Sequence, residues 1–221
     1  MCGRFALTAS GEELAEAFAL DAAPSLTPRY NIAPGQPVAV VRATTDGRRE
    51  AASLTWGFSA PAGAKARLLI NARAETAERL PGFRDCFRTG RCLVPASGFF
   101  EWQASAKPPQ PFYFRHREGR LFALAGLWRP GPPAAPGGAC VLLTTEPNSL
   151  VKPIHDRMPL IVPPDQHSLW LALGPLDPAA QRGLLDPLAA SLMTAHPVST
   201  AVNDARHDGA GCLEPARTLF D

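Results

Sequence analysis

Residues 91–103 read Arg-Cys-Leu-Val-Pro-Ala-Ser-Gly-Phe-Phe-Glu-Trp-Gln and carry two short apolar runs of the kind that recurs along this chain. Arg91–Val94 and Gly98–Gln103 are both predicted as strands, because β-branched and aromatic residues favour a pleated, half-buried surface. Similar runs predict further short strands at Phe5–Leu7, Pro37–Arg42, Ala51–Phe58, Phe112–His116, Leu121–Trp128, Cys140–Thr145 and Met193–Val198. We expect the runs at 112–116 and 121–128 to pair as a hairpin.

Helical signals are fewer than strand signals. A capping box at Ser10 and Glu13 begins a helix that we expect to bury Leu14 and Phe18. Residues 21–37 contain four prolines and are predicted as a loop. Many short strands with few helices, in no regular βαβ order, favour a compact α+β domain. Shorter helices are predicted at Glu75–Leu80, Pro164–Leu173 and Pro178–Leu188.

Composition limits the class of protein. The chain has 221 residues and a formal net charge of +2, so length allows one large or two small domains and charge alone does not indicate nucleic acid. Its five cysteines are an odd number without a C-x-x-C pair. We therefore expect no disulfide scaffold, no metal site and no cofactor, and a reducing cytoplasm. No signal peptide and no apolar run of about 20 residues is visible, so we expect no membrane association.

The basic residues are almost all arginines. Only three of the 22 are lysines, at 65, 107 and 152. Arginine binds phosphate through two hydrogen bonds and stacks on bases, so the set could face DNA. Codon bias would produce the same excess. Arg4, Arg73 and Arg157 are candidates to clamp phosphates, although each could equally pair with a nearby acid.

The second residue is the most informative one for function. Removal of Met1 would leave Cys2 with an amine and a thiol on adjacent carbons, a 1,2-aminothiol. An α-amine titrates near pH ~7.7–8.0 and can form a Schiff base with an aldehyde. The thiol can then close a five-membered thiazolidine ring. A cysteine after the start codon can also be incidental, so other residues must support this interpretation.

Three further polar residues are candidates for chemistry. Glu101 lies among aromatic residues, where desolvation would raise its pKa and suit it to proton transfer; the alternative is a surface residue on an edge strand. His155 lies in a proline-bounded loop and could act as a general acid or base, or be structural. Asn71 could hold an amine or hydroxyl through its amide, or be an ordinary turn residue. Trp56 could stack on a base or belong to the core.

Six motifs together carry a resemblance to a known family. In order along the chain they are Met1–Phe5, Tyr30–Gly35, Trp56-Gly57, Asn71–Thr76, Gly98–Trp102 and His155–Pro159. They resemble the SRAP family, named for SOS-response-associated peptidase. Val198–Asn203 and Cys212–Pro215 are similar to the closing segment of that family, so the resemblance covers nearly the whole chain.

The resemblance implies one α+β domain over residues 1–221, with a twisted, mostly antiparallel sheet and a few peripheral helices. It implies a cytoplasmic monomer in the DNA damage response that removes its own Met1 and binds single-stranded DNA. The exposed terminal residue would then react covalently with the aldehyde of an abasic site. By the same resemblance, the catalytic residues are Cys2 as nucleophile, Asn71 as positioning group, Glu101 as proton shuttle and His155 as assistant in sugar-ring opening. Those lining the DNA groove are Arg4, Asn31, Trp56, Arg73 and Arg157.

The sequence also departs from the family pattern, and two other functions stay open. Residues 58–65 lack the tryptophan that often follows Trp56-Gly57, Ser97 replaces a common acid, and Phe100 replaces a common tyrosine. A cysteine peptidase acting on other proteins could use Cys2 and His155. A non-covalent reader of modified or junction DNA would need only the groove, and would bind in a salt-sensitive way.

Overall fold

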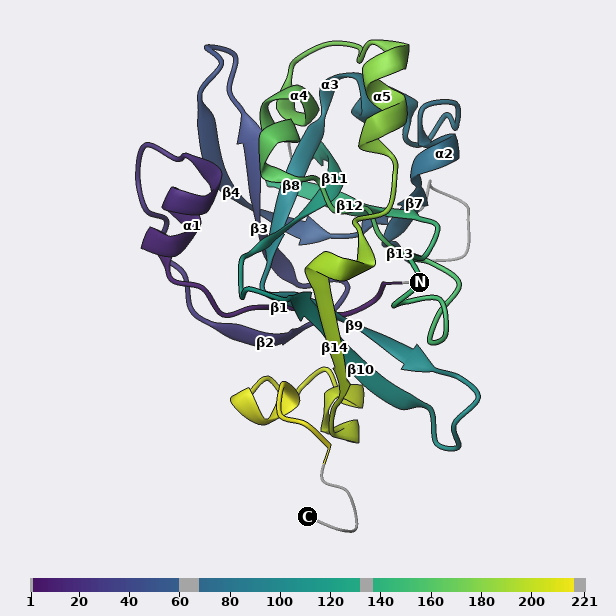
Figure 1. Cartoon of the computed structure of the whole chain (residues 1–221). Coiled ribbons are helices and arrows are strands. Elements are labelled where there is room, and N and C mark those ends of the chain that lie inside the picture. Colours follow the sequence, from purple (N-terminus) through teal and green to yellow (C-terminus); the bar gives the residue numbers. More distant parts are fainter. Residues whose placement is uncertain (1, 60–67, 132–136, 217–221) are drawn as a thin grey trace.

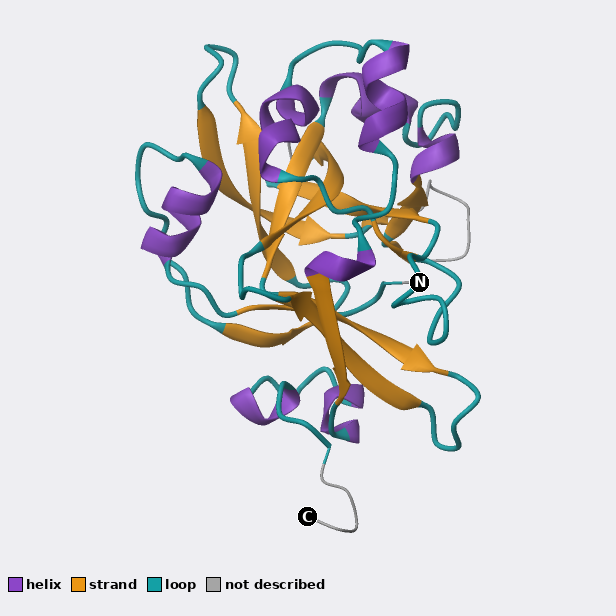
Figure 2. Cartoon of the chain, viewed as in Figure 1, coloured by secondary structure: helices purple, strands orange, loops and turns teal. Residues whose placement is uncertain are grey.

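A computed structural model describes residues 2–59, 68–131 and 137–216 of the chain. Its strands form two main sheets, and short helices lie around them (Figures 1 and 2). The helices are α1 (Gly11–Phe18), α2 (Ala74–Ala77), α3 (Arg84–Thr89), α4 (His167–Leu171) and α5 (Pro178–Leu184). Within the described ranges, no helix has both the length and the apolarity needed to cross a lipid bilayer.

The first sheet has five strands in the order β14-β10-β9-β1-β2, all antiparallel. They are β1 (Phe5–Leu7), β2 (Arg29–Ile32), β9 (Gly98–Gln103), β10 (Gln110–His116) and β14 (Met193–Pro197). The strand predictions for β1, β9, β10 and β14 are therefore confirmed. The loop prediction for residues 21–37 is wrong in part, because Arg29–Ile32 pairs with β1 despite the prolines that flank it.

The second sheet has seven strands, in the order β11-β8-β3-β4-β12-β13 with β7 also paired to β12. They are β3 (Pro37–Ala43), β4 (Arg49–Trp56), β7 (Asn71–Arg73), β8 (Arg91–Ala96), β11 (Phe122–Pro130), β12 (Gly138–Thr145) and β13 (Met158–Pro159). A small pair, β5 (Phe58–Ser59) and β6 (Leu68–Leu69), completes the described strands. Among the described strands, only the pairings of β12 with β4 and with β7 are parallel. The predicted α+β class with mostly antiparallel pairing is confirmed, but with two main sheets where one was expected.

The stretch from 91 to 103 connects the two sheets. β8 belongs to the seven-stranded sheet and β9 to the five-stranded one, and Ser97 is the bend between them. The chain crosses back between β10 and β11. The predicted hairpin of residues 112–116 with 121–128 is therefore wrong: β10 pairs with β9 and β14, whereas β11 pairs with β8 and β12. Local alternation of apolar residues predicts a strand but does not say which sheet will cover its apolar face.

The main core joins buried residues of both main sheets, and a smaller cluster lies on the other face of the five-stranded sheet. Phe99 packs in the main core, whereas Phe100 packs in the smaller cluster with residues of the segment 198–212. Successive strand residues point to opposite faces, so this division confirms the alternation expected for β9. Helix α1 begins with the predicted capping box and buries Leu14 and Phe18.

Candidate active site

Cys2 is the first residue that the structure describes, and it lies three residues before β1, the neighbour of β9. Its side chain is fully buried, and its backbone carbonyl accepts a hydrogen bond from Asn71 Nδ2 at 2.7 Å. Burial raises the pKa of the Cys2 thiol far above its usual range, and the nearby negative charge of Glu101 raises it further. The thiol is therefore held protonated at neutral pH.

Asn71 is positioned by the parallel pairing of β7 with β12, which places it opposite Leu142. Its Nδ2 is used by Cys2, but its buried Oδ1 has no hydrogen-bond partner among the described residues. Buried polar atoms almost always have a partner, so an unsatisfied acceptor favours a site where a donor binds. The Asn71 amide can hold an N–H or O–H group next to the start of the chain.

Glu101 is on β9, between β10 and β1, and is only 2% exposed. The alternative of a surface glutamate on an edge strand is therefore wrong, since β9 is an interior strand. Burial raises the pKa of Glu101 to about 8, as the aromatic surroundings predicted. At neutral pH the carboxyl is mostly protonated and can donate a proton before it accepts one.

His155 faces Glu101 from the loop that precedes β13, with Nε2 3.9 Å from Glu101 Oε2. Its Nδ1 lies 3.0 Å from the backbone nitrogen of Arg157, which can only donate. The pKa of His155 is lowered, chiefly by burial, so the ring is mostly neutral at pH 7. Nδ1 also lies 3.2 Å from the backbone carbonyl of Arg157, so the contacts of Nδ1 fit either tautomer of the ring. Asp156 Oδ1 also lies 3.0 Å from Nδ1 and would stabilise the charged ring.

Arg157 is held by Glu75, as the acid-pairing alternative predicted. The two residues form a pair of parallel hydrogen bonds, each 2.9 Å long, and Arg157 Nη2 also donates to the Thr144 carbonyl at 2.5 Å. These contacts fasten the loop that carries His155 to α2 and β12. An open depression of about 590 Å³ beside this loop is lined by Lys152, His155 and Arg157, among others.

Two residues predicted to line a DNA groove are buried and cannot do so in this structure. Trp56 has no exposed surface, and its Nε1 donates to the Ile70 carbonyl, so the core interpretation of Trp56 is correct. Asn31 is equally buried, and its Nδ2 donates to the backbone carbonyls of Val202, Asp204 and His207. Both side chains are bonded within the protein, so neither presents a free surface to DNA in this structure.

The predicted DNA-binding arginines differ in exposure and in the partners of their guanidinium groups. Arg4 is half-buried and donates through Nη1 to Asn31 Oδ1 at 2.7 Å and to the Val202 carbonyl at 2.8 Å. Arg73 is exposed, and its guanidinium has no ion-pair or hydrogen-bond partner among the described residues. Of the predicted phosphate-binding arginines, Arg73 is therefore the most accessible. Residues 60–67, which include most of the segment without tryptophan, lie outside the described ranges.

One structural partner of the site was not predicted. Asp208 accepts hydrogen bonds from the backbone nitrogens of Tyr30 and Asn31, at 2.5 and 2.9 Å, and pairs with Arg29. It fastens the end of the chain to β2, and Asn31 in turn holds Arg4. No sequence signal links Asp208 to these residues, which lie nearly 180 positions earlier. In the described part of the chain, no group of three side chains could hold a metal ion.

Comparison with known proteins gives consistent matches over nearly the whole chain. The profile of a family described as SOS response associated peptidase (SRAP) matches residues 1–205. The chain is 34% identical to the abasic site processing protein YoqW of Bacillus subtilis over 224 residues, which cover 97% of this chain and 99% of that protein. It is 30% identical to the abasic site processing protein YedK of Escherichia coli over 223 residues, 97% of this chain and all of that protein.

Solved structures agree on the fold. A protein of Bacteroides thetaiotaomicron superposes with a TM-score of 0.82 over 98% of this chain and 100% of its own, at 21% identity. A phage-related protein of Bordetella bronchiseptica has a TM-score of 0.72 and 30% identity, and the match covers 90% of this chain and 95% of that one.

Proposed function

This chain belongs to the SOS response associated peptidase (SRAP) family, and on that basis we propose that it captures abasic sites in single-stranded DNA as a covalent adduct of Cys2. The relatives are named abasic site processing proteins, which supports an abasic site as the partner. The observation that carries the proposal is the convergence of Asn71, Glu101 and His155 around the start of the chain. The protein would act as a monomer.

The first step is removal of Met1 by the protein itself, which exposes the Cys2 amine. Hydrolysis of the Met1–Cys2 bond needs a proton for the departing amine. Glu101 is suited to supply it, because burial raises its pKa to about 8 and leaves it protonated at neutral pH. The Asn71 amide already holds the Cys2 carbonyl, so it would fix the new terminus in place.

The second step opens the abasic sugar. The sugar is mostly a closed hemiacetal, and its aldehyde appears when the C1′ hydroxyl loses a proton while the ring oxygen gains one. His155 is mostly neutral and partly exposed, and it faces Glu101 at 3.9 Å. The two groups can exchange protons with the sugar in turn, which is the arrangement that general acid–base catalysis needs.

The third step forms the adduct. The Cys2 amine adds to the aldehyde carbon, the resulting hydroxyl leaves as water, and an imine remains. The thiol sulfur then bonds to the imine carbon, and its proton passes to the nitrogen, which closes a thiazolidine ring. Since the Cys2 thiol has a raised pKa, it needs a base, and the Glu101 carboxylate left by the previous step can serve. Removing the imine prevents the β-elimination, a lyase-type reaction, that would cut the strand.

Single-stranded DNA suits this site because no base has to leave a duplex. The exposed Arg73 and the partly exposed Arg157 would contact phosphates on the way to Cys2. Arg157 would contact a phosphate while its guanidinium remains paired with Glu75. Such contacts make the binding step sensitive to salt.

The proposal is tested with the protein lacking Met1 and a single strand that carries one abasic site. On a denaturing gel the wild-type protein is expected to give a slowly migrating adduct, and Cys2→Ala none. Cys2→Ser keeps the amine but not the thiol, so it should give an imine that only borohydride reduction makes permanent. A wild-type protein without adduct, or a Cys2→Ala variant that crosslinks equally well, would contradict the proposal. Cleavage of peptides in trans would favour a peptidase instead.

Glu75 is predicted to support the reaction through Arg157. Glu75→Gln removes the charge that holds the Arg157 side chain, and with it the support of the backbone N–H that orients His155. We expect adduct formation to slow by about three- to tenfold, because the ion pair is partly exposed and its loss is worth only ~1 kcal/mol. Binding of intact single-stranded DNA should not weaken, since a negative charge is removed. Rates and binding are compared with Glu12→Gln, which makes the same charge change on an exposed turn of α1. An unchanged rate in Glu75→Gln would remove this role.

A further inference from the structure

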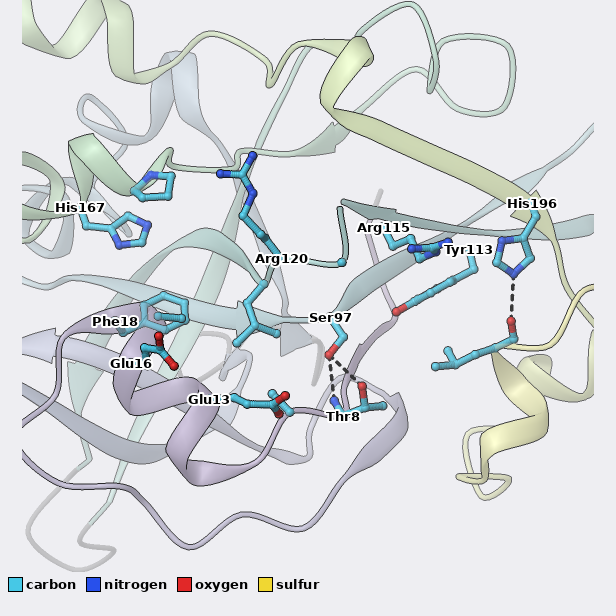
Figure 3. A pocket seen from close by; sticks show the side chains of 16 residues that line it. Thr8, Glu13, Glu16, Phe18, Ser97, Tyr113, Arg115, Arg120, His167 and His196 are labelled. Atoms are coloured by element: carbon cyan, nitrogen blue, oxygen red, sulfur yellow. Dashed lines mark hydrogen bonds between the residues drawn. The ribbon is translucent and has the colours of Figure 1, made fainter. Parts of the chain in front are cut away.

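The tautomer of a histidine ring follows from what its two nitrogens contact. A ring nitrogen that is hydrogen-bonded to a carbonyl carries a proton, and one that accepts from a backbone N–H does not. Nε2 of His167 lies 3.2 Å from the Val162 carbonyl. Nε2 of His196 lies 2.9 Å from the Leu213 carbonyl, a bond drawn in Figure 3. Both rings, which lie away from the candidate active site, therefore carry a proton on Nε2.

At His155, by contrast, a single ring nitrogen has contacts of both kinds. Asp156 Oδ1 lies 3.0 Å from Nδ1 and the Arg157 carbonyl oxygen lies 3.2 Å from it, and both of these oxygens can only accept. The Arg157 backbone nitrogen lies 3.0 Å from Nδ1 and can only donate. The acceptors favour a proton on Nδ1, whereas the donor favours a proton on Nε2, which lies 3.9 Å from Glu101 Oε2.

The Asp156 carboxylate adds charge to one side of this balance. Arg157 offers Nδ1 one neutral donor and one neutral acceptor, so its two contacts nearly cancel. A hydrogen bond to an ionised group is roughly twice as strong as one between neutral groups, so the carboxylate decides in favour of a proton on Nδ1. The Asp156 side chain is 89% exposed, and water limits the strength of such a bond. Its effect on a rate should therefore be moderate.

Asp156 also acts through its charge on both members of the acid–base pair. Burial lowers the pKa of His155 and the positive charge at the start of the chain lowers it further, whereas Asp156 raises it. Burial raises the pKa of Glu101 to about 8, and the charge of Asp156 contributes to that rise. One carboxylate thus makes His155 a stronger base and holds the Glu101 proton more firmly. The other charged side chains beside the ring are Glu146, Lys152 and Arg157.

We propose that Asp156 is a positioning residue that keeps the His155 ring proton on Nδ1 and so presents the Nε2 lone pair to the reacting sugar. The kinetic consequence rests on the proposed function, whereas the place of the ring proton does not require DNA. In ring opening, Nε2 takes the proton of the C1′ hydroxyl and Glu101 gives its proton to the ring oxygen. The bond between C1′ and the ring oxygen breaks, and the aldehyde forms.

This division of roles also accounts for the charges that the step creates. The His155 ring becomes a cation, which the Asp156 carboxylate stabilises from the Nδ1 side. Glu101 becomes the carboxylate that the closing of the thiazolidine ring needs as a base. With the ring proton on Nε2 instead, both His155 and Glu101 would present a donor to the sugar, and neither could accept the C1′ hydroxyl proton.

NMR of the protein lacking Met1, with its histidine nitrogens labelled and without DNA, locates the ring proton directly. Protonated and unprotonated ring nitrogens differ strongly in chemical shift, and the His155 signals are those that disappear in His155→Gln. At a pH where the ring is neutral, we expect the His155 proton on Nδ1 in the wild type. Asp156→Asn keeps the shape of the side chain but not its charge, and should move the proton to Nε2. His167 and His196 should keep theirs on Nε2 in every variant, as internal references.

The pH dependence of adduct formation is the second readout. At neutral pH Asp156→Asn should be about three- to tenfold slower, since the lost partner is exposed. The reaction needs neutral His155 and protonated Glu101, and loss of the Asp156 charge lowers both pKa values, so both limbs of the bell-shaped profile should move to lower pH. Asp165→Asn, the same change on an exposed turn elsewhere, should move neither limb.

Three results would overturn the proposal. The first is a His155 proton on Nε2 in the wild type, and the second is the same proton position in the wild type and in Asp156→Asn. The third is a rate that falls equally at every pH with both limbs in place, which would make the role of Asp156 purely structural. Each of these leaves the wild-type adduct intact, whereas a wild-type protein without adduct would contradict the proposed function and leave the NMR result standing. All variants are first checked for wild-type circular dichroism.

Discussion

A version of the protein that retains extra residues before Met1 will form no stable adduct with an abasic strand. The proposed reaction needs the α-amine and the thiol on one residue, and an extension turns that amine into an amide without nucleophilic nitrogen. The thiol alone cannot compensate, because burial and the charge of Glu101 hold its pKa far above neutral. This is the largest effect expected for any single change, a complete loss of the denaturing-gel band.

The control carries the same extra residues after Asp221 instead of before Met1. The start of the chain is then unchanged, and the adduct should still form. Intact-protein mass spectrometry must accompany both samples, since the protein could remove an extension as it would remove Met1. Adduct formation by molecules whose mass includes the extension would show that the α-amine is dispensable, and the mechanism would then be wrong.

Glu101→Gln is expected to slow both Met1 removal and adduct formation by about 10²–10⁴-fold, the usual contribution of a general acid or base. The amide has the shape of the protonated carboxyl but cannot release and regain a proton. Binding of intact single-stranded DNA should be unchanged, because Glu101 is only 2% exposed. The measurement is a time course of gel-resolved adduct beside fluorescence anisotropy on the same strand. Equal rates for Glu101→Gln and wild type would remove Glu101 from the mechanism.

The same substitution has a predictable effect on stability, which also serves as a folding control. Burial raises the pKa of Glu101 from its ordinary 4.5 to about 8, so the folded protein holds this proton more tightly than the unfolded chain. The resulting stabilisation is complete below pH about 4.5 and is lost as pH rises through about 8. Glutamine never ionises, so the variant does not lose this stability. The urea midpoint of Glu101→Gln should therefore rise relative to that of the wild type as the pH increases from about 5 to about 9. A difference that does not change with pH would mean that Glu101 titrates normally.

Much of the local structure follows from short-range patterns. The capping box at Ser10 and Glu13 begins α1 as expected, because both partners lie within one turn. The alternation of Phe99, Phe100 and Glu101 predicted a desolvated carboxyl, since a strand places neighbours on opposite faces regardless of its partners.

Errors arose where distant segments decide the outcome. The strands predicted at 112–116 and 121–128 were expected to pair, yet each finds its neighbours in a different sheet. Asn31 and Trp56 were predicted to line a DNA groove. In the structure, the Asn31 side chain donates a hydrogen bond to the Val202 carbonyl and the Trp56 side chain donates one to the Ile70 carbonyl. Asp208 fixes β2 from the far end of the chain. No local pattern contains the identity of such partners.

The amino-acid sequence by itself determined which residues could react: an amine and a thiol that only a terminal cysteine can offer together, and a carboxyl flanked by aromatic rings. Their order along the chain was enough to indicate the family. Only the tertiary structure decided which of them meet, because β7, β9 and the loop before β13 are far apart in sequence. Burial then decided the rest: it raised the pKa of Glu101, kept the Cys2 thiol protonated and withdrew Asn31 and Trp56 from solvent. A side chain's solvation depends on everything packed around it, and that information is spread over the whole chain.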